Sequence, residues 1–191
     1  MRKQVTLPLA DARIMELKAG DAVFLNGPLL SGRDAAHKRM LTALGAGEPL
    51  PINIAGETIY YVGPCPTPPG KVIGSAGPTT SGRMDLYTPK LIELGLRGML
   101  GKGQRSAEVI SAIVKFHAIY FAALGGAGAL IAHSIRAAEI VAYPDLGPEA
   151  IYQLILEDLP VIVAIDAYGN DLYQDGRAKY TNLGVTGNAT N

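Results

Sequence analysis

The chain has 191 residues, 48% of them hydrophobic, and its 17 Lys and Arg residues balance 17 Asp and Glu residues. This length suits one domain with a sizeable core, and the zero net charge argues against nucleic-acid or membrane partners, because both need a clustered basic excess. The single cysteine, Cys65, excludes a disulfide framework, and alone it cannot hold a metal ion or an iron–sulfur cluster.

The first part of the chain predicts short strands followed by a helix. Strands are expected at residues 3–7 and 22–25, each bounded by turn residues. A helix is expected over residues 31–41, with Ser31 as its N-cap and Asp34 in its first turn.

The middle of the chain contains many prolines and glycines. Residues 58–62 and 71–73 are expected to form strands, and the proline-rich residues 63–70 between them form a stiff loop. A helix follows the loop of residues 74–85. Its N-cap, first residue and stop signal are expected at Thr88, Pro89 and Gly95.

The second half of the chain adds further strands. A strand at residues 97–100 precedes a helix over 107–116 with Ser106 as its N-cap, and residues 117–123 fit either a strand or a helix. Residues 129–132 suit a small helix. The remaining strands are expected at residues 138–142, 149–156, 160–165 and 172–173.

This succession of elements predicts an α/β domain with a mixed sheet. Strands alternate with helices up to about residue 145 and dominate after it. No linker divides the chain, so residues 1–175 form a single domain, and the polar residues 176–191 are expected to form a flexible C-terminal tail. Residues 1–9 lack the apolar run of a signal peptide, and no apolar stretch reaches the roughly 20 residues of a membrane span. We therefore expect a cytoplasmic location.

Three loops each place a cation after a glycine: Arg33, Arg83 and Lys102. Glycine permits close backbone approach to a ligand, arginine offers a planar fork for a carboxylate, and lysine offers a point charge. Three converging cations would suit a dicarboxylate. The alternative is that each cation is a solvated charge on a surface turn. The hydroxyl groups of residues 79–81 beside Arg83 favour a ligand for that loop.

His37 has two interpretations. It lies four positions after Arg33, so both side chains project from one face of the predicted helix. It could act as a general acid or base beside an arginine that holds substrate. It could also fill a gap and bond a carbonyl. Structural roles are favoured for His117 and His133, and Cys65 has no neighbouring histidine to activate it as a nucleophile.

Several motifs are similar to those of a known family. They lie at residues 33–39, 61–66, 74–85, 101–103 and 125–129. Together they resemble the β subunit of class I, iron–sulfur-dependent fumarate hydratase, which forms the C-terminal domain in single-chain members. The likeness runs from about Gly20 to Tyr173, with the segments in the same order and at similar spacing.

The resemblance implies a fold, a reaction and a partner. The fold would be a swivelling β/β/α domain with a mixed sheet, and the reaction would be the reversible hydration of fumarate to L-malate. A partner α subunit would carry three cysteines that hold a [4Fe–4S] cluster, whose open iron acts as a Lewis acid. This chain, with Cys65 alone, would not bind the cluster. A homodimer of β domains is a second candidate assembly.

The resemblance also assigns roles to individual residues. Arg33, Arg83 and Lys102 match the family's carboxylate-binding cations, and Thr79 matches a hydroxyl residue near the carbon that gains or loses a proton. His37 matches a histidine assigned to the active site of related tartrate dehydratase β subunits. Threonine is a poor base unless nearby cations stabilise its alkoxide, whereas His37 is chemically the easier base but could instead orient Arg33.

Two alternative functions remain open. L(+)-tartrate dehydratase β subunits share the motifs around Arg33 and Thr79. The forms found here at residues 63–66 and 81–85 favour fumarate over tartrate, and mesaconate is a third candidate substrate. The other alternative is a stand-alone dicarboxylate-binding module such as a metabolite sensor.

Overall fold

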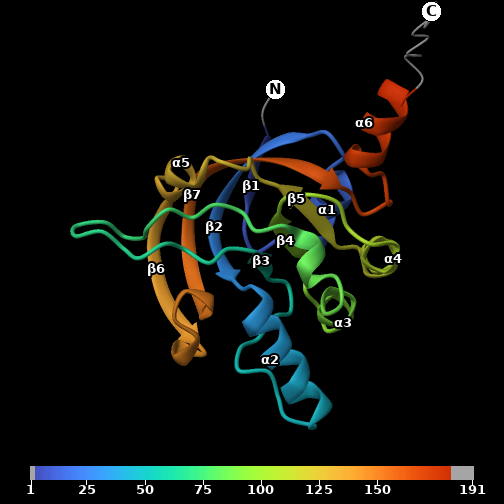
Figure 1. Cartoon of the computed structure of the whole chain (residues 1–191). Helices are drawn as coiled ribbons and strands as arrows, with labels where there is room; N and C mark the ends of the chain where they lie inside the picture. The colour runs from blue at the N-terminus through green and yellow to red at the C-terminus, as the bar shows by residue number, and fades with distance from the viewer. Residues whose placement is uncertain (1–2, 182–191) are drawn as a thin grey trace, which may run out of the picture.

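A closed five-stranded barrel lies at the centre of the computed structural model, which describes residues 3–181 (Figure 1). Its strands are β2 (Ala22–Ser31), β3 (Thr58–Tyr60), β4 (Gly98–Gly101), β5 (Ile119–Ala122) and β7 (Ile151–Ile165). The first four run parallel, and β7 closes the barrel by pairing antiparallel with both β5 and β2. Strand β1 (Lys3–Thr6) adds to β2, and β6 (Ile135–Ala142) adds to β7. The prediction of a mixed sheet is confirmed.

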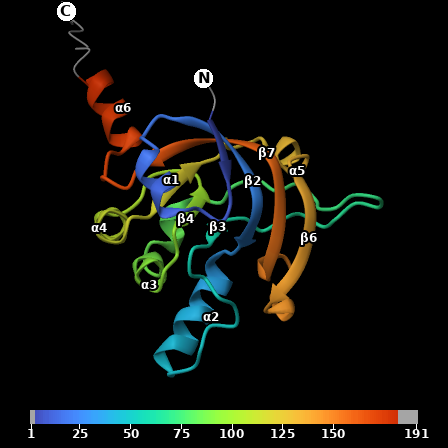
Figure 2. The ribbon, with the colours of Figure 1, turned by 180° about the vertical axis from the view of Figure 1, so that it is seen from behind.

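Helices connect the strands and cover part of the barrel (Figures 1 and 2). They are α1 (Asp11–Glu16), α2 (Asp34–Gly45), α3 (Thr88–Glu93), α4 (Ala107–Phe116), α5 (Gly128–Ala132) and α6 (Leu172–Thr181), with 3-10 turns η1 (Ser81–Met84) and η2 (Pro144–Glu149). Helices α3 and α4 pack against each other, and α2 contacts η1 and η2. No helix within residues 3–181 is long and apolar enough to cross a membrane.

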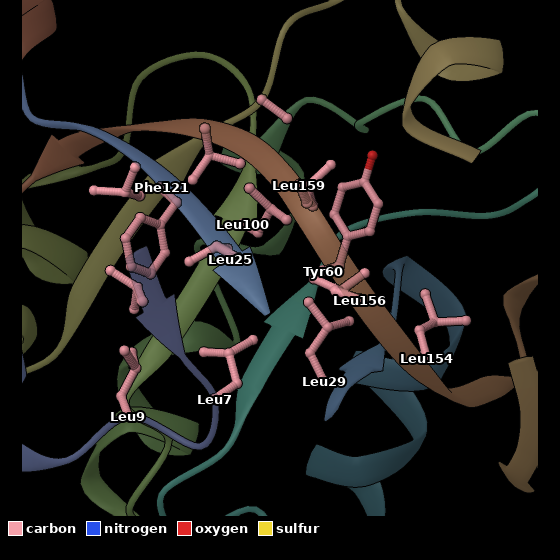
Figure 3. Packing of buried hydrophobic residues seen from close by; sticks show 14 of the residues in the cluster. Leu7, Leu9, Leu25, Leu29, Tyr60, Leu100, Phe121, Leu154, Leu156 and Leu159 are labelled. Atoms are coloured by element: carbon pink, nitrogen blue, oxygen red, sulfur yellow. The ribbon is translucent and has the colours of Figure 1, made fainter. Parts of the chain in front are cut away.

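Alternating residues of the central strands build two hydrophobic cores. Side chains of successive strand residues point to opposite faces of a sheet. One set consists of Tyr60, Leu100 and Phe121. It packs inside the barrel with residues such as Leu25 and Leu159 (Figure 3). The other set packs in a second cluster that includes residues of α2, α3 and α4, and it consists of Ile59, Met99 and Tyr120. Both faces of these strands are therefore buried, as is usual for parallel strands.

Several predicted boundaries are confirmed. Helix α4 has the predicted bounds, and the Ser106 hydroxyl accepts a hydrogen bond from the Val109 amide at 3.4 Å. Gly95 follows the end of α3 and has a φ of 108°, a conformation that favours glycine. The prediction for Thr88 is off by one residue. Thr88 is the first helical residue, and its hydroxyl donates to the Met84 carbonyl at 2.9 Å.

Ser31 does not cap α2, and that prediction is wrong. Ser31 is the last residue of β2, and the N-cap of α2 is Arg33. The Ser31 hydroxyl accepts a hydrogen bond from the Tyr152 amide at 2.9 Å and donates to the Ala150 carbonyl at 3.4 Å. These bonds to the start of β7 occupy the group that would have capped the helix.

Several other predicted strands also differ from the structure. Residues 71–73 lie in the long extended loop that projects from the barrel, where no neighbouring strand pairs with them (Figure 1). The strands predicted at 149–156 and 160–165 belong to one strand, β7. The residues between them stay in this strand through an irregularity around Asp158, whose φ is 51°. Residues 172–173 begin α6, and the Asp171 carboxylate accepts from the Tyr173 amide at 2.8 Å. Of the predicted tail, residues 176–181 belong to α6 and residues 182–191 lie outside the described part of the chain.

Asp166 fixes the turn after β7. Its buried carboxylate accepts hydrogen bonds from the amides of Ala19, Tyr168 and Asn170 at 3.0–3.1 Å and from the Asn170 side chain at 2.8 Å. Burial alone would raise the pKa of Asp166, but these bonds stabilise the charged form and hold the pKa below its ordinary value of 3.8. The ionised carboxylate therefore stabilises the fold at neutral pH.

Replacing Asp166 by asparagine is expected to lower the free energy of unfolding at pH 7 by about 1–3 kcal/mol, because an amide cannot accept all of these bonds. The folded-state pKa lies below the unfolded one, so the contribution of Asp166 is lost as the pH falls through these values. Denaturant unfolding from pH 7 to 3 should therefore show the two proteins converging at low pH. Asp11→Asn, whose side chain is 82% exposed, is the control. A difference that stays constant with pH would contradict this role.

Candidate active site

The candidate site lies at one edge of the barrel, where the carboxyl ends of parallel strands meet. Arg33 follows β2 by two residues, and Lys102 follows β4 directly. The loop beginning at Tyr61 leaves β3 between them in the strand order. Ligands of α/β sheets bind outside the carboxyl ends of the strands. The topology therefore places two of the predicted cations at the edge where a ligand site is expected.

The loop of residues 74–85 is fixed to this edge by backbone hydrogen bonds. The Thr79 amide donates to the Tyr61 carbonyl at 2.7 Å, and the Lys102 amide donates to the Thr79 carbonyl at 3.3 Å. The Ser81 amide donates to the Lys102 carbonyl at 2.8 Å. Thr79 and Lys102 are therefore neighbours, although more than twenty residues separate them in the sequence.

Arg33 and Arg83 meet on one carboxylate, that of Asp34. The Arg83 Nε donates to Asp34 Oδ1 at 2.8 Å, and the Arg33 Nη2 lies 3.5 Å from Asp34 Oδ2. The Arg33 Nη2 also lies 3.5 Å from Glu149 Oε1. The structure thus brings together two of the three cations for which the sequence predicted a common ligand.

These cations keep unused hydrogen-bond donors. The Arg33 Nε is buried without a hydrogen-bond partner among the described residues. Arg83 bonds Asp34 through Nε alone in this part of the chain, so its two terminal nitrogens stay unpaired, and its side chain is 53% exposed. Lys102 forms no ion pair within residues 3–181. Asp34 and Glu149 pair with the two arginines, so the positive charge of Lys102 has no carboxylate partner in this part of the chain.

His37 lies behind Arg33 and is fully buried. Its Nδ1 lies 2.8 Å from the Arg33 carbonyl oxygen, so Nδ1 carries the proton and donates, and Nε2 has no partner among the described residues. The ring contacts Tyr61 edge-on, with centroids 5.4 Å apart. Burial lowers the pKa of His37 to about 4, although the bond to the carbonyl opposes the shift. This geometry favours the interpretation in which His37 orients Arg33.

Sequence reasoning missed Arg105, which holds the end of the loop of residues 74–85. Its side chain is fully buried, and its Nε donates to Asp85 Oδ1 at 2.7 Å. Its Nη2 donates to the Thr88 hydroxyl at 3.0 Å. Burial alone would lower the pKa of Arg105, but its electrostatic interactions with Tyr61 and Asp85 raise it. A charged residue shortly after Lys102 was the available signal, but nothing in the sequence showed that it is buried.

Two further residues escaped prediction. Glu149 lies beside Arg33, and its Oε2 accepts from the Ala35 amide at 2.9 Å across 114 positions of sequence. No local pattern marks that contact. The Tyr120 hydroxyl donates to the Gly103 carbonyl at 2.9 Å and lies 2.8 Å from the Ser81 hydroxyl, which joins two loops of the site.

The described residues do not supply the ligands of an iron–sulfur cluster. Cys65 is exposed and is the only cysteine in the sequence, whereas such clusters take several cysteine thiolates. Within residues 3–181, no three His, Cys, Asp or Glu side chains are grouped so that they could hold a metal ion.

Fold and site together define an α/β barrel domain with a cationic edge. The chain belongs to the family described as Fumarase C-terminus, which matches residues 2–176. It is 41% identical over 165 residues to "Fumarate hydratase class I, aerobic" of Escherichia coli K12, and this match covers 85% of the chain and 30% of that protein. It is 39% identical over 163 residues to "Fumarate hydratase 2" of Leishmania major, covering 84% of the chain and 29% of that protein.

A shorter relative matches over most of its length. The chain is 36% identical over 172 residues to "Putative L(+)-tartrate dehydratase subunit beta" of Methanocaldococcus jannaschii, covering 87% of the chain and 88% of that protein. The chain thus spans about 30% of the length of the fumarate hydratases that it matches, and most of the length of a subunit. The family that the sequence motifs suggested is confirmed.

His37 is expected to titrate with a midpoint near pH 4 and to be the neutral Nδ1–H tautomer at pH 7. Nitrogen-15 chemical shifts of labelled histidines, followed from pH 7 to 3.5, measure both properties. The unfolded chain takes up this proton near the ordinary pKa of 6.5, and the folded chain only near 4. The free energy of unfolding should therefore fall as the pH is lowered from 6.5 to 4. A midpoint near 6.5 would contradict the burial of the ring.

Replacing Arg105 by methionine should destabilise the protein by about 3–5 kcal/mol, because it leaves the Asp85 carboxylate without its buried partner. Equilibrium unfolding in urea measures the change. Arg39→Met is the matched control, since it breaks a two-bond pair with Asp145 at the surface and should move the unfolding midpoint little. Equal effects of the two substitutions would show that Arg105 does not support the loop.

Proposed function

We propose that this chain is the β component of a class I fumarate hydratase that reversibly hydrates fumarate to L-malate. The observation that carries the proposal is the meeting of Arg33 and Arg83 on one carboxylate with donors left over, beside a loop that carries Lys102. Family membership and the named activities of the relatives support the same reaction class, a hydro-lyase.

In this proposal the cations bind the two carboxylates of the substrate. The terminal nitrogens of Arg83 form a fork for one carboxylate, and Arg33 and Lys102 supply further positive charge. The uncompensated charge of this edge favours a dianion over a neutral ligand. The substrate's carboxylates are thereby held with the reacting double bond between fixed charges.

The proposal gives Thr79 the role of the group that takes or gives the proton on carbon. Backbone bonds fix Thr79 beside Lys102, and such a cation lowers the free energy of a threonine alkoxide. His37 is assigned to hold the Arg33 backbone from behind, since its buried ring has no open path to the substrate.

A [4Fe–4S] cluster on a partner α chain would supply the Lewis acid for the hydroxyl group that is added or removed. Two findings support a partner: this chain lacks the thiolates for a cluster, and the Methanocaldococcus jannaschii relative is named as a subunit. We further propose that this domain swivels as a rigid body, so that its cationic edge closes over substrate held on the partner. A homodimer of this chain is a separate hypothesis that sedimentation of the isolated chain would test.

The proposal is tested by anaerobic co-expression with a cluster-bearing α chain from the same genome, followed by assays with fumarate, L(+)-tartrate and mesaconate. Turnover of fumarate with the highest kcat/KM is expected. Exclusive turnover of tartrate would instead favour the second candidate, which the coverage of the M. jannaschii relative supports. Tight dicarboxylate binding by the isolated chain, with no turnover in any complex, would favour a stand-alone binding module.

Arg83→Met is expected to lower kcat/KM for fumarate by about 100-fold or more, because it removes the exposed guanidinium fork. Steady-state assays of the cluster-loaded complex measure the loss, and circular dichroism checks the fold. Arg136→Met on β6 removes a similarly exposed arginine, 59% exposed, and should leave kcat/KM unchanged. Full activity of Arg83→Met would show that the loop does not touch substrate.

A further inference from the structure

We propose that Asp34 is a positioning residue that orients Arg83 for end-on binding of a substrate carboxylate and couples it to Arg33. This inference rests on the proposed function, because it concerns the use of the same two cations. The two arginines lie on separate segments, and neither is part of a strand. Arg83 is on η1, in the connection between β3 and β4, and Asp34 lies 49 residues earlier, at the start of α2.

The geometry of the Asp34–Arg83 pair determines which face of the guanidinium is free. A carboxylate can bind arginine side-on, through Nε and one terminal nitrogen, or end-on, through both terminal nitrogens. Asp34 Oδ1 occupies Nε at 2.8 Å. A substrate carboxylate is thereby directed to the two terminal nitrogens, which have no partner among residues 3–181.

The second oxygen of Asp34 connects this pair to Arg33. Asp34 Oδ2 is buried and accepts no hydrogen bond within the described chain, and it lies 3.5 Å from the Arg33 Nη2. The buried Arg33 Nε also lacks a partner there. One carboxylate therefore offsets the repulsion between two guanidinium groups without using up the donors of either.

Two further groups restrain the Arg33 side chain. Glu149 Oε1 lies 3.5 Å from its Nη2, and the Glu149 Oε2 is tied to the Ala35 amide at 2.9 Å. The Arg33 side chain also lies against Gly63, where an added Cβ would be 2.9 Å from Nη1 and 3.0 Å from Cδ. Arg33 is thus restrained by several groups, whereas Arg83 is held by Asp34 alone among the described side chains. The effect of losing Asp34 should therefore appear mainly at Arg83.

A merely structural role for Asp34 predicts a different outcome. An acidic residue in the first turn of a helix stabilises it through the helix dipole, and its loss would then lower stability without changing how Arg83 binds substrate. The control is Asp145→Ala, which removes another carboxylate paired with an arginine, Arg39 on α2. Among the described residues Asp145 pairs with neither Arg33 nor Arg83.

The test uses Asp34→Ala, Asp34→Asn and Asp145→Ala in the cluster-loaded two-chain complex. Asp34→Ala should lower kcat/KM for fumarate on the order of 10- to 100-fold, since misplacement of a binding group has effects of this size. Asp34→Asn keeps one acceptor oxygen for the Arg83 Nε and should recover part of the loss. Asp145→Ala should keep full activity. Full kcat/KM in Asp34→Ala would overturn the proposal.

A second readout does not depend on turnover. The Nε–H resonance of Arg83, assigned by its loss in Arg83→Lys, should show slowed hydrogen exchange in the wild-type chain and fast exchange in Asp34→Ala. Unchanged exchange would overturn the positioning role even if activity fell. If the wild-type complex turned over none of the dicarboxylates but Asp34→Ala still altered this resonance, the proposed function would fail while the orientation of Arg83 by Asp34 would stand.

Discussion

Two guanidinium groups on neighbouring loops repel each other unless an anion lies between them, and here that anion is the carboxylate of Asp34. The fold brings these three side chains together from separate segments. Strand β2 ends so that Arg33 and Asp34 begin α2. The loop of residues 74–85 brings Arg83 to Asp34, and η2 places Glu149 beside Arg33. The pairing of β2 with β7 places η2 beside α2, and backbone hydrogen bonds to Tyr61 and Lys102 hold the loop of residues 74–85 at the same edge.

Two kinds of arginine therefore occur within one small region. Arg105 is fully buried, and its bonds to Asp85 and Thr88 satisfy it, which is the pattern of a group that holds a loop in place. Arg33 and Arg83 are only partly compensated and keep unused donors among the described residues. Unpaired donors at a protein surface bind water or a ligand, and the positive excess selects an anion.

The sequence predicted what depends on local patterns. The bounds of α4, the glycine stop at Gly95 and the mixed sheet follow from caps, turn residues and apolar runs. The three cations were singled out because each follows a glycine in a loop, and their binding role stays a prediction. What sequence reasoning missed depends on contacts between distant segments. Ser31 bonds the start of β7 instead of capping a helix, and Glu149 reaches Arg33 across most of the chain. Neither contact leaves a local signal.

The central claim is that this edge of the barrel binds a dicarboxylate that a second chain helps to enclose. The most direct measurement is a crystal structure of the two-chain complex with a dicarboxylate bound. The account predicts one carboxylate end-on to the terminal nitrogens of Arg83 at about 2.7–2.9 Å, with Arg33 and Lys102 around the same ligand and Asp34 still on the Arg83 Nε. A dicarboxylate bound elsewhere, with these loops facing solvent, would contradict it.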